Sequence, residues 1–266
     1  MDLSIIIVSF NTKALLKKCL ESLPSNVEII VIDNNSTDGT VQMLREIKTS
    51  GKREIKLIEN RDNVGFAKAV NQGLKQAKGE YLLLLNSDIF AKEDALAKLL
   101  AFVKKEPQVG VVGGCLLNPD GSPQGSCFYL PTLLRTVKEF WLNGSSTLGK
   151  YTPLGDKPVE VEAVMGAVFL IPKKVLQQVG FFDERYFMYF EDLDYCRRVR
   201  ENGFKVYYLP EAKFIHEHGA SGRSIPGQTH CWLVQSSKVY HGKTKYYLIT
   251  FIIWLGQKCQ KILKKK

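Results

Sequence analysis

Four short polar segments of the sequence carry side chains that could bind a polar ligand. They are Ser9-Phe10-Asn11, Asp33-Asn34-Asn35-Ser36, Asn60 with Asn63-Val64-Gly65, and Asn86-Ser87-Asp88. Each segment directly follows an apolar run of the kind that forms a buried strand. Ligands of open parallel sheets bind outside the carboxyl ends of the strands, so these side chains are expected to converge on one crevice. The competing interpretation is that Asn, Asp, Ser and Gly only form turns there.

The kind of ligand is narrowed by motifs that the sequence lacks. A GxxxxGK[ST] phosphate loop is absent, and GxGxxG does not follow the first apolar run. The charge of a bound diphosphate would then be offset most simply by Mg²⁺ or Mn²⁺, which prefer hard oxygen ligands. Asp88, at the end of the fourth apolar run, is the carboxylate in position to bind such an ion.

A second group of carboxylates, Glu191, Asp192 and Asp194, lies at the expected start of a helix. A carboxylate there could act as a general base, or it could only cap the helix and interact with its dipole. Asp194 points about 200° away from Asp192 around a helix, so the two do not easily serve one site. Asp194 is expected instead to pair with Arg197 or Arg198 on the helix surface.

Two histidines, His216 and His218, follow another apolar run and stand beside Gly219. A lone histidine is usually structural. Two histidines within three residues, beside a glycine turn, make metal binding as strong an expectation as a structural role.

The elements that position these residues alternate between strand and helix patterns. Apolar runs predict strands at 3–10, 27–33, 55–60, 80–86 and 109–114, and helical spacing predicts helices at 12–23, 39–49, 66–76 and 92–105. This rhythm implies right-handed crossovers and a Rossmann-like, mainly parallel α/β sheet flanked by helices.

The rhythm stops at Asn118. The stretch 118–160 is punctuated by Pro, Gly and Ser and is expected to cross one face of the sheet. The chain then returns to the sheet at 161–172, forms a helix over 192–203, and adds two short strands at 204–210 and 212–216.

The composition is that of an ordinary globular protein, except that the C-terminal residues are strongly basic. The 266 residues are 45% hydrophobic and 24% charged, enough for one sizeable core. The net charge of +10 is concentrated after Glu217, the last acidic residue, where Arg223 and eight lysines follow. Among them lies an apolar run, 246–255. This basic, apolar tail is expected to form a helix in the interface of an anionic membrane, or else to pack on the domain or in a dimer contact.

The remaining features argue against an exported or membrane-spanning protein. The six cysteines form no CxxC pair, so reduced thiols are expected, without a disulfide framework or zinc knuckle. The N-terminus has no basic flank like that of a secretory signal. No apolar run reaches the roughly 18 residues of a spanning helix. The expected location is cytoplasmic, peripheral at the inner face of the cytoplasmic membrane.

Several segments occur in an order that carries a family resemblance. They are SIIIVSFN (4–11), DNNSTDGT (33–40), NVGFAKAVNQG (63–73), YLLLLNSD (81–88), the stretch 166–198 that contains FEDLDYCRR, and FIHEHGASGRS (214–224). This order resembles family 2 glycosyltransferases with the GT-A fold, and within them the bacterial rhamnosyltransferase-type branch. The resemblance covers about 1–225. It implies a nucleotide-binding half, 1–115, an acceptor half, 116–225, and a separate tail, 226–266.

The resemblance also implies residue roles on the donor side. The positions matched to donor contacts are Ser9, Phe10, Asn11, Asp33, Asn35, Asn63, Gly65, Ala67, Asn86 and Ser87. Asp33 matches the acidic residue that hydrogen-bonds a pyrimidine base. The segment Asn86-Ser87-Asp88 stands where the family has its Asp-x-Asp metal motif, with Asn86 in place of the first carboxylate. Asp88 is thereby left as the acidic ligand of Mg²⁺ or Mn²⁺.

On the acceptor side, Asp192 matches the catalytic base and Glu191 precedes it. His216 matches the histidine that completes the metal site, and His218 is the weaker candidate. The implied reaction is a metal-dependent, inverting transfer of a sugar from a dTDP- or UDP-sugar. Rhamnose is the first candidate for this sugar. The implied acceptor is a hydroxyl of a cell-surface saccharide or a lipid-linked acceptor.

Two other functions stay open at this point. A sugar-nucleotide pyrophosphorylase has a related topology but carries a glycine-rich, basic loop after its first strand, which SFNTK (9–13) lacks. A non-enzymatic polyanion-binding protein would explain the charge of +10. However, that charge is confined to one tail and no RNA-binding aromatic motif is present, so nucleic acid is not an expected partner. The oligomeric state does not follow from the sequence.

Overall fold

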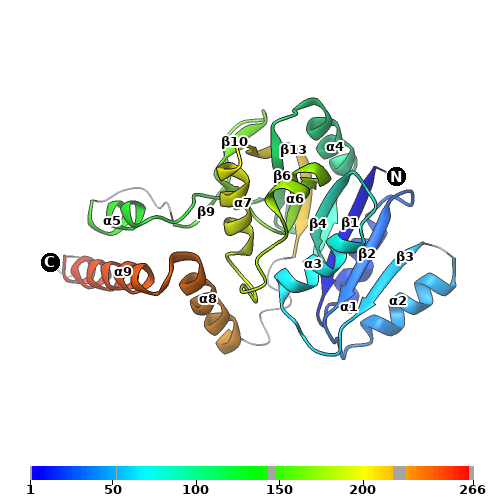
Figure 1. Ribbon diagram of the computed structural model, residues 1–266, viewed down its shortest axis with the longest axis horizontal. Helices are drawn as coiled ribbons and strands as arrows, with labels where there is room; N and C mark the ends of the chain where they lie inside the picture. The colour runs from blue at the N-terminus through cyan, green and yellow to red at the C-terminus, as the bar shows by residue number, and fades with distance from the viewer. Residues whose placement is uncertain (1, 52, 143–147, 218–225, 264–266) are drawn as a thin grey trace.

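A mixed sheet forms the centre of the protein, with helices on both of its faces (Figure 1). The structure is a computed structural model that describes residues 2–51, 53–142, 148–217 and 226–263. The strands are β1 (Leu3–Ser9), β2 (Glu28–Asp33), β3 (Ile55–Glu59), β4 (Tyr81–Asn86), β5 (Ile89–Ala91), β6 (Val109–Leu117), β7 (Pro123–Gln124), β8 (Cys127–Phe128), β9 (Lys150–Tyr151), β10 (Val159–Val161), β11 (Ala163–Val164), β12 (Val168–Pro172) and β13 (Lys205–His216). The helices are α1 (Lys13–Glu21), α2 (Thr40–Thr49), α3 (Phe66–Gln76), α4 (Ala95–Lys105), α5 (Leu133–Trp141), α6 (Lys173–Val179), α7 (Glu191–Glu201), α8 (Pro226–His241) and α9 (Lys243–Leu263).

The strand order of the main sheet is β10-β13-β6-β12-β4-β1-β2-β3. The pairs β1–β2, β1–β4, β2–β3 and β6–β13 are parallel, whereas β12 runs antiparallel to both of its neighbours. The mainly parallel α/β sheet expected from the sequence is therefore confirmed. The strands and helices predicted for the first 115 residues are all present, with bounds within three residues of those expected.

The core lies on both faces of this sheet because successive side chains of a strand point to opposite sides. In β1, Ile5 and Ile7 pack in the cluster that includes residues of α1, α2 and α4, whereas Ile6 packs with residues of α3, α6 and α7. All three isoleucines are at most 1% exposed. Burial on both faces explains why the strand reads as a continuous apolar run rather than an alternating one.

Strand β13 corrects the prediction of two short strands near the end of the domain. It is continuous from Lys205 to His216, with a shift of register between Leu209 and Lys213. Pro210, which has no N–H to donate, lies in the shifted segment, as expected for proline at a bulge. Beyond the shift, β13 pairs antiparallel with β5 and aligns His216 with Ile89.

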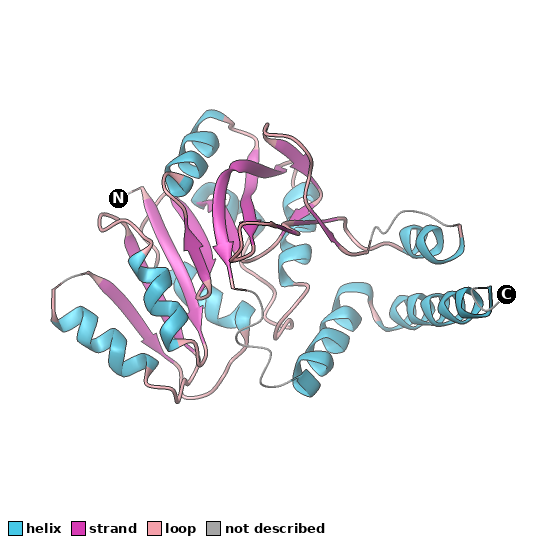
Figure 2. Ribbon diagram, turned by 180° about the vertical axis from the view of Figure 1, so that it is seen from behind, coloured by secondary structure: helices cyan, strands magenta, loops and turns pink. Residues whose placement is uncertain are grey.

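The stretch 118–160 also departs from its expected course over the sheet. Strands β8 and β9 form a second sheet with β11, and α5 extends away from the main sheet toward the C-terminal helices (Figures 1 and 2). Helix α9 packs on both α5 and α8. In the part of the chain that the structure describes, no helix has the length and hydropathy needed to cross a membrane. All six cysteines are free, as expected.

Candidate active site

The polar segments predicted to converge do lie at one edge of the sheet. Strand pairing aligns Ser9 with Asp33 and Val8 with Asn86, so the carboxyl ends of β1, β2 and β4 meet there. A cavity of about 870 Å³ opens at this edge. The predicted site residues that line it are Phe10, Asn63, Gly65, Asn86, Ser87, Asp88, Glu191, Asp192 and His216. The predicted residues outside its lining are Ser9, Asn11, Asp33, Asn35 and Ala67. His218 lies outside the described residues.

Some of the residues outside the lining shape the site from behind. The Ser9 hydroxyl lies 3.0 Å from that of Thr12, which donates a hydrogen bond of 2.9 Å to Ser87 Oγ. This buried chain of hydroxyls ties the end of β1 to the end of β4. Asn11 accepts a hydrogen bond from the backbone N–H of Thr37 at 2.8 Å, which joins the loops after β1 and β2.

Asp33 presents one oxygen for binding. Its Oδ1 accepts from the backbone N–H of Ser36 at 2.8 Å, whereas its Oδ2 is buried and has no hydrogen-bond partner among the described residues. Buried polar atoms are normally hydrogen-bonded. The free oxygen of Asp33, which is 1% exposed, therefore marks a position where a ligand donor would fit.

Asn34, rather than the predicted Asn35, lines the cavity. Asn35 is exposed and has a left-handed backbone with φ 68°. Asn34 donates from Nδ2 to Asn63 Oδ1 at 3.2 Å and to the Gly65 carbonyl at 3.3 Å. It thereby connects the end of β2 to the segment before α3. The two asparagines are adjacent in the sequence, so only the backbone conformation separates their roles.

Gly65 is required by close packing as well as by its backbone. Its φ is 86°, and a Cβ there would lie 2.7 Å from the Phe187 carbonyl oxygen. The same carbonyl accepts from the Phe66 N–H at 2.6 Å. This approach brings the start of α3 against the loop that precedes α7, and so joins the two sides of the cavity.

Asp88 and His216 come together although 128 positions separate them. The distance from His216 Nε2 to Asp88 Oδ1 is 3.6 Å, as predicted for a shared ion. The antiparallel β5–β13 pair places them there, and the Glu217 N–H donates to the Asp88 carbonyl at 3.0 Å. Both side chains line the cavity and are under 10% exposed.

Gln124 is a further residue of this group that the sequence did not reveal. Its Oε1 is hydrogen-bonded to Nδ1 of His216, which leaves Nε2 directed at Asp88. Such partners orient metal-binding imidazoles. Two ligand atoms 3.6 Å apart fit one ion, since bonds to it are about 2.0–2.6 Å long. Within the described residues no cluster of three or more His, Cys, Asp and Glu side chains could hold a metal.

Asp192 is held in place by the backbone. Its Oδ2 accepts from the Gly166 N–H at 3.0 Å, and its Oδ1 accepts from the Leu193 N–H at 2.8 Å. Burial raises the pKa of this carboxyl against the lowering effect of these hydrogen bonds and of the Lys150 charge. A fixed carboxylate with a raised pKa at a cavity wall suits a general base.

Glu191 lies deeper than Asp192, and its burial favours the protonated form of its carboxyl group. It is 7% exposed, and its Oε2 has no hydrogen-bond partner in the described part of the chain. Burial, and then the neighbouring charge of Asp192, raise the pKa of Glu191 to about 8. Of the two adjacent carboxyl groups, Asp192 is therefore the one suited to accept a proton.

The titration of Glu191 predicts a pH dependence of stability. Between its ordinary pKa and about 8, the folded protein keeps this proton while the unfolded chain releases it. The free energy of unfolding should therefore fall as pH rises through that window. Glu191→Gln mimics the protonated group, so the Tm of this variant should decline less than that of wild type between pH 5 and pH 8. Parallel Tm curves would mean that Glu191 is ionised in the folded state.

The backbone just before these carboxylates is strained. Tyr189 and Phe190 have φ values of 72° and 68°, and both line the cavity. Such conformations cost on the order of 1–3 kcal/mol each for non-glycine residues. They turn the chain sharply into α7 and direct Glu191 and Asp192 toward the cavity.

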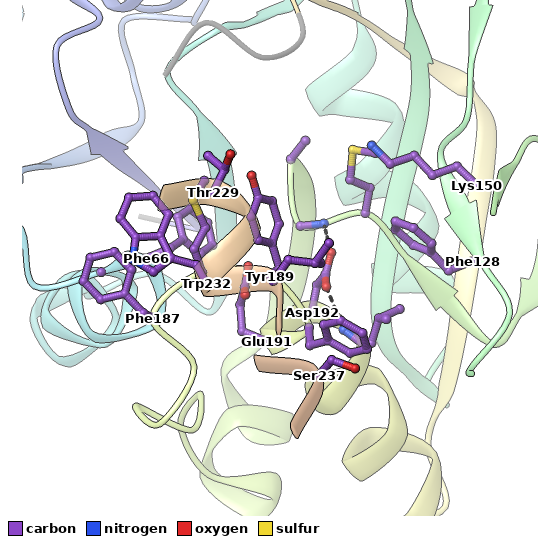
Figure 3. A pocket seen from close by; sticks show the side chains of 18 of the residues that line it. Phe66, Phe128, Lys150, Phe187, Tyr189, Glu191, Asp192, Thr229, Trp232 and Ser237 are labelled. Carbon is purple, nitrogen blue, oxygen red and sulfur yellow. Dashed lines mark hydrogen bonds between the residues drawn. The ribbon is translucent and has the colours of Figure 1, made fainter. Parts of the chain in front are cut away.

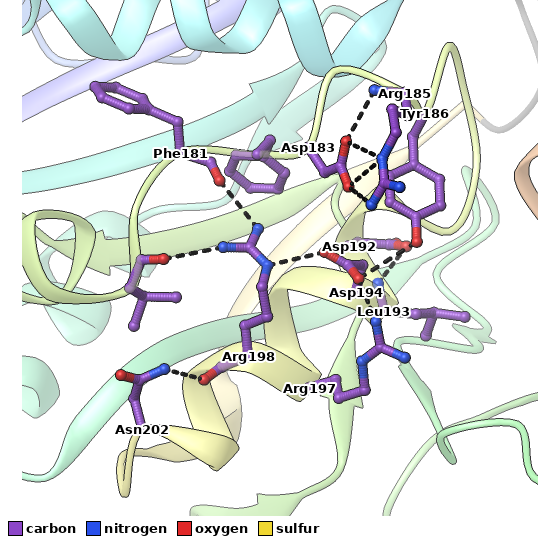
Figure 4. A network of polar contacts seen from close by, with 12 residues as sticks. Phe181, Asp183, Arg185, Tyr186, Asp192, Leu193, Asp194, Arg197, Arg198 and Asn202 are labelled. Atoms are coloured by element: carbon purple, nitrogen blue, oxygen red, sulfur yellow. Dashed lines mark hydrogen bonds and ion pairs between the residues drawn. The ribbon is translucent and has the colours of Figure 1, made fainter. Parts of the chain in front are cut away.

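Asp194 faces away from the cavity, as the helix geometry predicted. It pairs with both arginines: its Oδ1 accepts from Arg197 at 2.5 Å and its Oδ2 from Arg198 at 2.9 Å (Figure 4). The expectation of a surface ion pair is wrong, however, since the Asp194 side chain is only 5% exposed. Arg198 also donates to the carbonyls of Val179 and Phe181. The network therefore anchors α7 to the loop beside it.

The fold and family of the protein follow from comparison with known proteins. The sequence pattern described as Glycosyl transferase family 2 matches residues 4–161, more than half of the chain. The chain belongs to this family. A curated relative, the N-acetylglucosaminyl-diphospho-decaprenol L-rhamnosyltransferase of Mycobacterium tuberculosis, is 28% identical over 82% of the chain and 77% of its own length. The low-salt glycan biosynthesis hexosyltransferase Agl10 of Haloferax volcanii is 24% identical over 81% of the chain and 67% of its own length.

Solved structures share the GT-A fold with this family 2 glycosyltransferase. The mannosyltransferase PcManGT of Pyrobaculum calidifontis, in complex with GDP-Man and Mn²⁺, aligns over 94% of the chain with a TM-score of 0.60 and 18% identity. The TarS 1–349 fragment of S. aureus, in complex with UDP-GlcNAc, aligns over 95% with the same TM-score and identity. The chain spans 64% of the first of these structures and 70% of the second.

Proposed function

We propose that this glycosyltransferase moves a sugar from a nucleoside diphosphate sugar to an acceptor hydroxyl, with inversion at the anomeric carbon. The observation that carries the proposal is the shared cavity. The Asp88–His216 pair and the backbone-held carboxylate of Asp192 line it together. The first group suits a diphosphate with its counter-ion, and the second suits a hydroxyl that must lose a proton.

Different residues of the chain would contact the sugar donor and the acceptor. Asp33 and Asn34, at the end of β2, would bind the nucleoside, and Asp88 with His216 would hold the diphosphate end. Asp192 would accept the proton of the acceptor hydroxyl as its oxygen attacks the anomeric carbon. The bond to the nucleoside diphosphate breaks in the same displacement, which inverts the configuration.

A divalent cation, Mg²⁺ or Mn²⁺, is part of the proposal. Asp88 Oδ1 and His216 Nε2 are the protein ligands, and Gln124 fixes the imidazole from behind. When bound, the ion offsets the negative charge that develops on the leaving diphosphate. Solved relatives of this fold contain Mn²⁺, which supports the choice.

The proposed donor is a dTDP- or UDP-sugar, with rhamnose as the first candidate. Support for rhamnose comes from the Mycobacterium tuberculosis relative, whose name specifies an L-rhamnosyltransferase. Support for a uridine nucleotide comes from TarS, whose structures include UDP and UDP-GlcNAc complexes.

The proposed acceptor is a cell-surface saccharide or a lipid-linked saccharide, reached from the cytoplasmic side of the membrane. Residues 226–266 would associate with an anionic membrane surface, while 1–225 carry the chemistry. Support comes from α9, which has no acidic residue and exposes Tyr247, Leu248, Phe251 and Trp254. Cosedimentation with anionic vesicles tests this association. High salt should weaken the binding, because the attraction between the lysines and the anionic lipids extends only about a Debye length.

A donor screen tests the proposed reaction. Purified full-length protein is incubated with dTDP-rhamnose, UDP-hexoses and GDP-mannose, with Mg²⁺, with Mn²⁺ or with EDTA. The expected result is metal-dependent release of nucleoside diphosphate from a dTDP- or UDP-sugar, and loss of release with EDTA. Release that is equal in EDTA would contradict the role given to Asp88 and His216.

Gln124 offers a separate test of the ion site. Gln124→Leu removes the partner of His216 Nδ1, so the half-saturating metal concentration should rise about 10–100-fold. At saturating metal the rate should recover. Gln42→Leu, on the exposed side of α2, is the matched control and should leave the metal titration unchanged. An unchanged titration in Gln124→Leu would show that His216 does not bind the ion.

A further inference from the structure

Helix α8 contacts the segment 187–190, which leads into the carboxylates at the start of α7. The Ser236 hydroxyl donates a hydrogen bond of 2.8 Å to the Met188 carbonyl. Ser236 is only 2% exposed, so this hydrogen bond is sheltered from water. The rings of Trp232 and Phe187 pack together, with their centroids 4.7 Å apart (Figure 3). Helix α8 therefore holds the first half of the segment by one polar and one aromatic contact.

Tyr240 extends this contact to the start of α7. Its ring centroid lies 5.3 Å from that of Phe190, and the guanidinium carbon of Arg197 lies 4.5 Å from the same ring. A guanidinium group over an aromatic face is attracted to it. Arg197 also pairs with Asp194. Tyr240, which is 8% exposed, therefore connects α8 both to Phe190 and to the buried ion-pair network of α7.

The residues of α8 that make these contacts are four positions apart, at 232, 236 and 240. Helix positions with this spacing lie on one face. One stripe of α8 therefore follows the segment from its first residue to its last. The neighbouring stripe, with the same spacing, lines the cavity and consists of Thr229, Leu233, Ser237 and His241.

The segment 187–190 needs such support because its backbone is strained. Tyr189 and Phe190 have φ values of 72° and 68°. Conformations of this kind persist in non-glycine residues only where surrounding contacts hold them. Helix α8 contacts Met188 and Phe190, the residues on both sides of Tyr189. Loss of these contacts would let the backbone relax, and the carboxylates that follow it would move.

We propose that α8 is a positioning element of the catalytic site. Its stripe of Trp232, Ser236 and Tyr240 holds the strained segment in the conformation that directs Asp192 to the acceptor hydroxyl. None of the three takes part in the proton transfer. Helix α8 then belongs with the residues that carry out the reaction, although it follows residue 225, where the sequence predicts the tail to begin. The inference rests on the proposed function only in taking Asp192 as the base.

Hydrogen exchange of the full-length protein reports the position of Asp192 without any substrate. The Gly166 N–H donates to Asp192 Oδ2 at 3.0 Å, so its protection from exchange falls when Asp192 moves away. Ser236→Ala removes the hydrogen bond to Met188 and should raise exchange at Gly166 by about 3–10-fold, the equivalent of one neutral hydrogen bond. Exchange at Ile6, in the buried strand β1, should stay the same.

Nucleotide release from dTDP-rhamnose or UDP-glucose separates positioning from donor binding. Ser236→Ala should lower kcat by about 3–10-fold. Tyr240→Leu should lower it on the order of 10²-fold, because a displacement of about 1 Å at the reacting groups can cost that much. Donor KM should change little in both variants, since Asp88 and His216 are the residues proposed to hold the diphosphate. A changed donor KM at constant kcat would overturn the inference.

Two matched variants control for effects on the helix itself. Gln235→Ala makes the same substitution at the exposed neighbouring position of α8 and should leave both kcat and exchange at Gly166 unchanged. Tyr240→Phe keeps the ring that contacts Phe190 and should retain most of the kcat that Tyr240→Leu loses.

The outcomes separate this inference from the proposed function. Equal exchange at Gly166 in wild type and in Ser236→Ala would overturn the positioning role. An equally large rise at Ile6 would overturn it too, because α8 would then only stabilise the whole domain. Wild-type protein that releases no nucleotide from any nucleotide sugar would contradict the proposed function, whereas exchange at Gly166 would still decide whether α8 positions Asp192.

Discussion

The Asp192→Asn variant should transfer sugar between about 10² and 10⁴ times more slowly than wild type, the usual contribution of a general base. Asparagine keeps the shape of the side chain but cannot accept the proton of the acceptor hydroxyl. Donor KM should change little, because Asp88 and His216, rather than Asp192, are the residues proposed to hold the diphosphate of the donor. Steady-state kinetics with a nucleotide-release assay measure both constants.

Two controls make this result specific to the proton acceptor. The amide introduced by Asp192→Asn has a single carbonyl oxygen, so either the Gly166 or the Leu193 N–H loses its acceptor, at a cost of about 1 kcal/mol. Thermal unfolding of the variant therefore accompanies the kinetics. Asp156→Asn, in an exposed loop, should keep wild-type rates. If Asp192→Asn is active and a folded Asp194→Asn is not, the base has been assigned to the wrong carboxylate.

Asp194→Asn should instead act on stability, by about 3 kcal/mol, the lower end of the cost of breaking a buried ion pair. The carboxylate is almost fully buried and serves both Arg197 and Arg198. Asparagine would present an N–H group to one of these guanidinium groups and leave its charge unpaired. The two arginines are 36% and 24% exposed, so water can solvate them in part, which places the cost at the lower end.

Urea denaturation measures this change. A surface pair of the same spacing would contribute only about 0.2–0.5 kcal/mol, so the two descriptions of Asp194 are easily told apart. Glu201→Gln makes the same kind of substitution at an exposed position near the end of α7 and should change the free energy of unfolding little. A loss of less than about 0.5 kcal/mol in Asp194→Asn would contradict the burial of this network.

The elements of the fold were largely predictable because their signals are local. Apolar runs such as Leu3–Ser9 and helical spacing such as Phe66–Gln76 are visible in any window of the sequence. The continuity of β13 was not predictable from the sequence. Pro210 interrupts the strand pattern, whereas pairing with the distant strand β6 keeps the strand continuous. The course of α5 was missed for the same reason, since its partner α9 lies more than 100 positions away.

The site was predictable where strand ends determine it and unpredictable where side-chain packing does. Asp88 and His216 lie at the ends of β4 and β13, and their pairing was expected from the family resemblance, whereas the β5–β13 ladder that brings them together was not predicted. Lys150 reaches the cavity, and Gln124 reaches the His216 imidazole behind it, from short strands with no periodic pattern. The burial of Asp194 depends on loop carbonyls that accept from Arg198, and no spacing in the helix reveals them.

The short ladder between β5 and β13 fixes where Asp88 and His216 lie, independently of which side chains stand at these two positions. Main-chain hydrogen bonds hold positions 88 and 216 side by side, so a substitution at either position exchanges the donor atoms without separating the two backbones. Ligand softness decides which divalent metal a site prefers. A change of metal preference is therefore reachable by single substitutions at these two positions. If the proposed ion site is correct, a related chain could change the ion that it uses while the sheet, and the cavity it supports, stay the same.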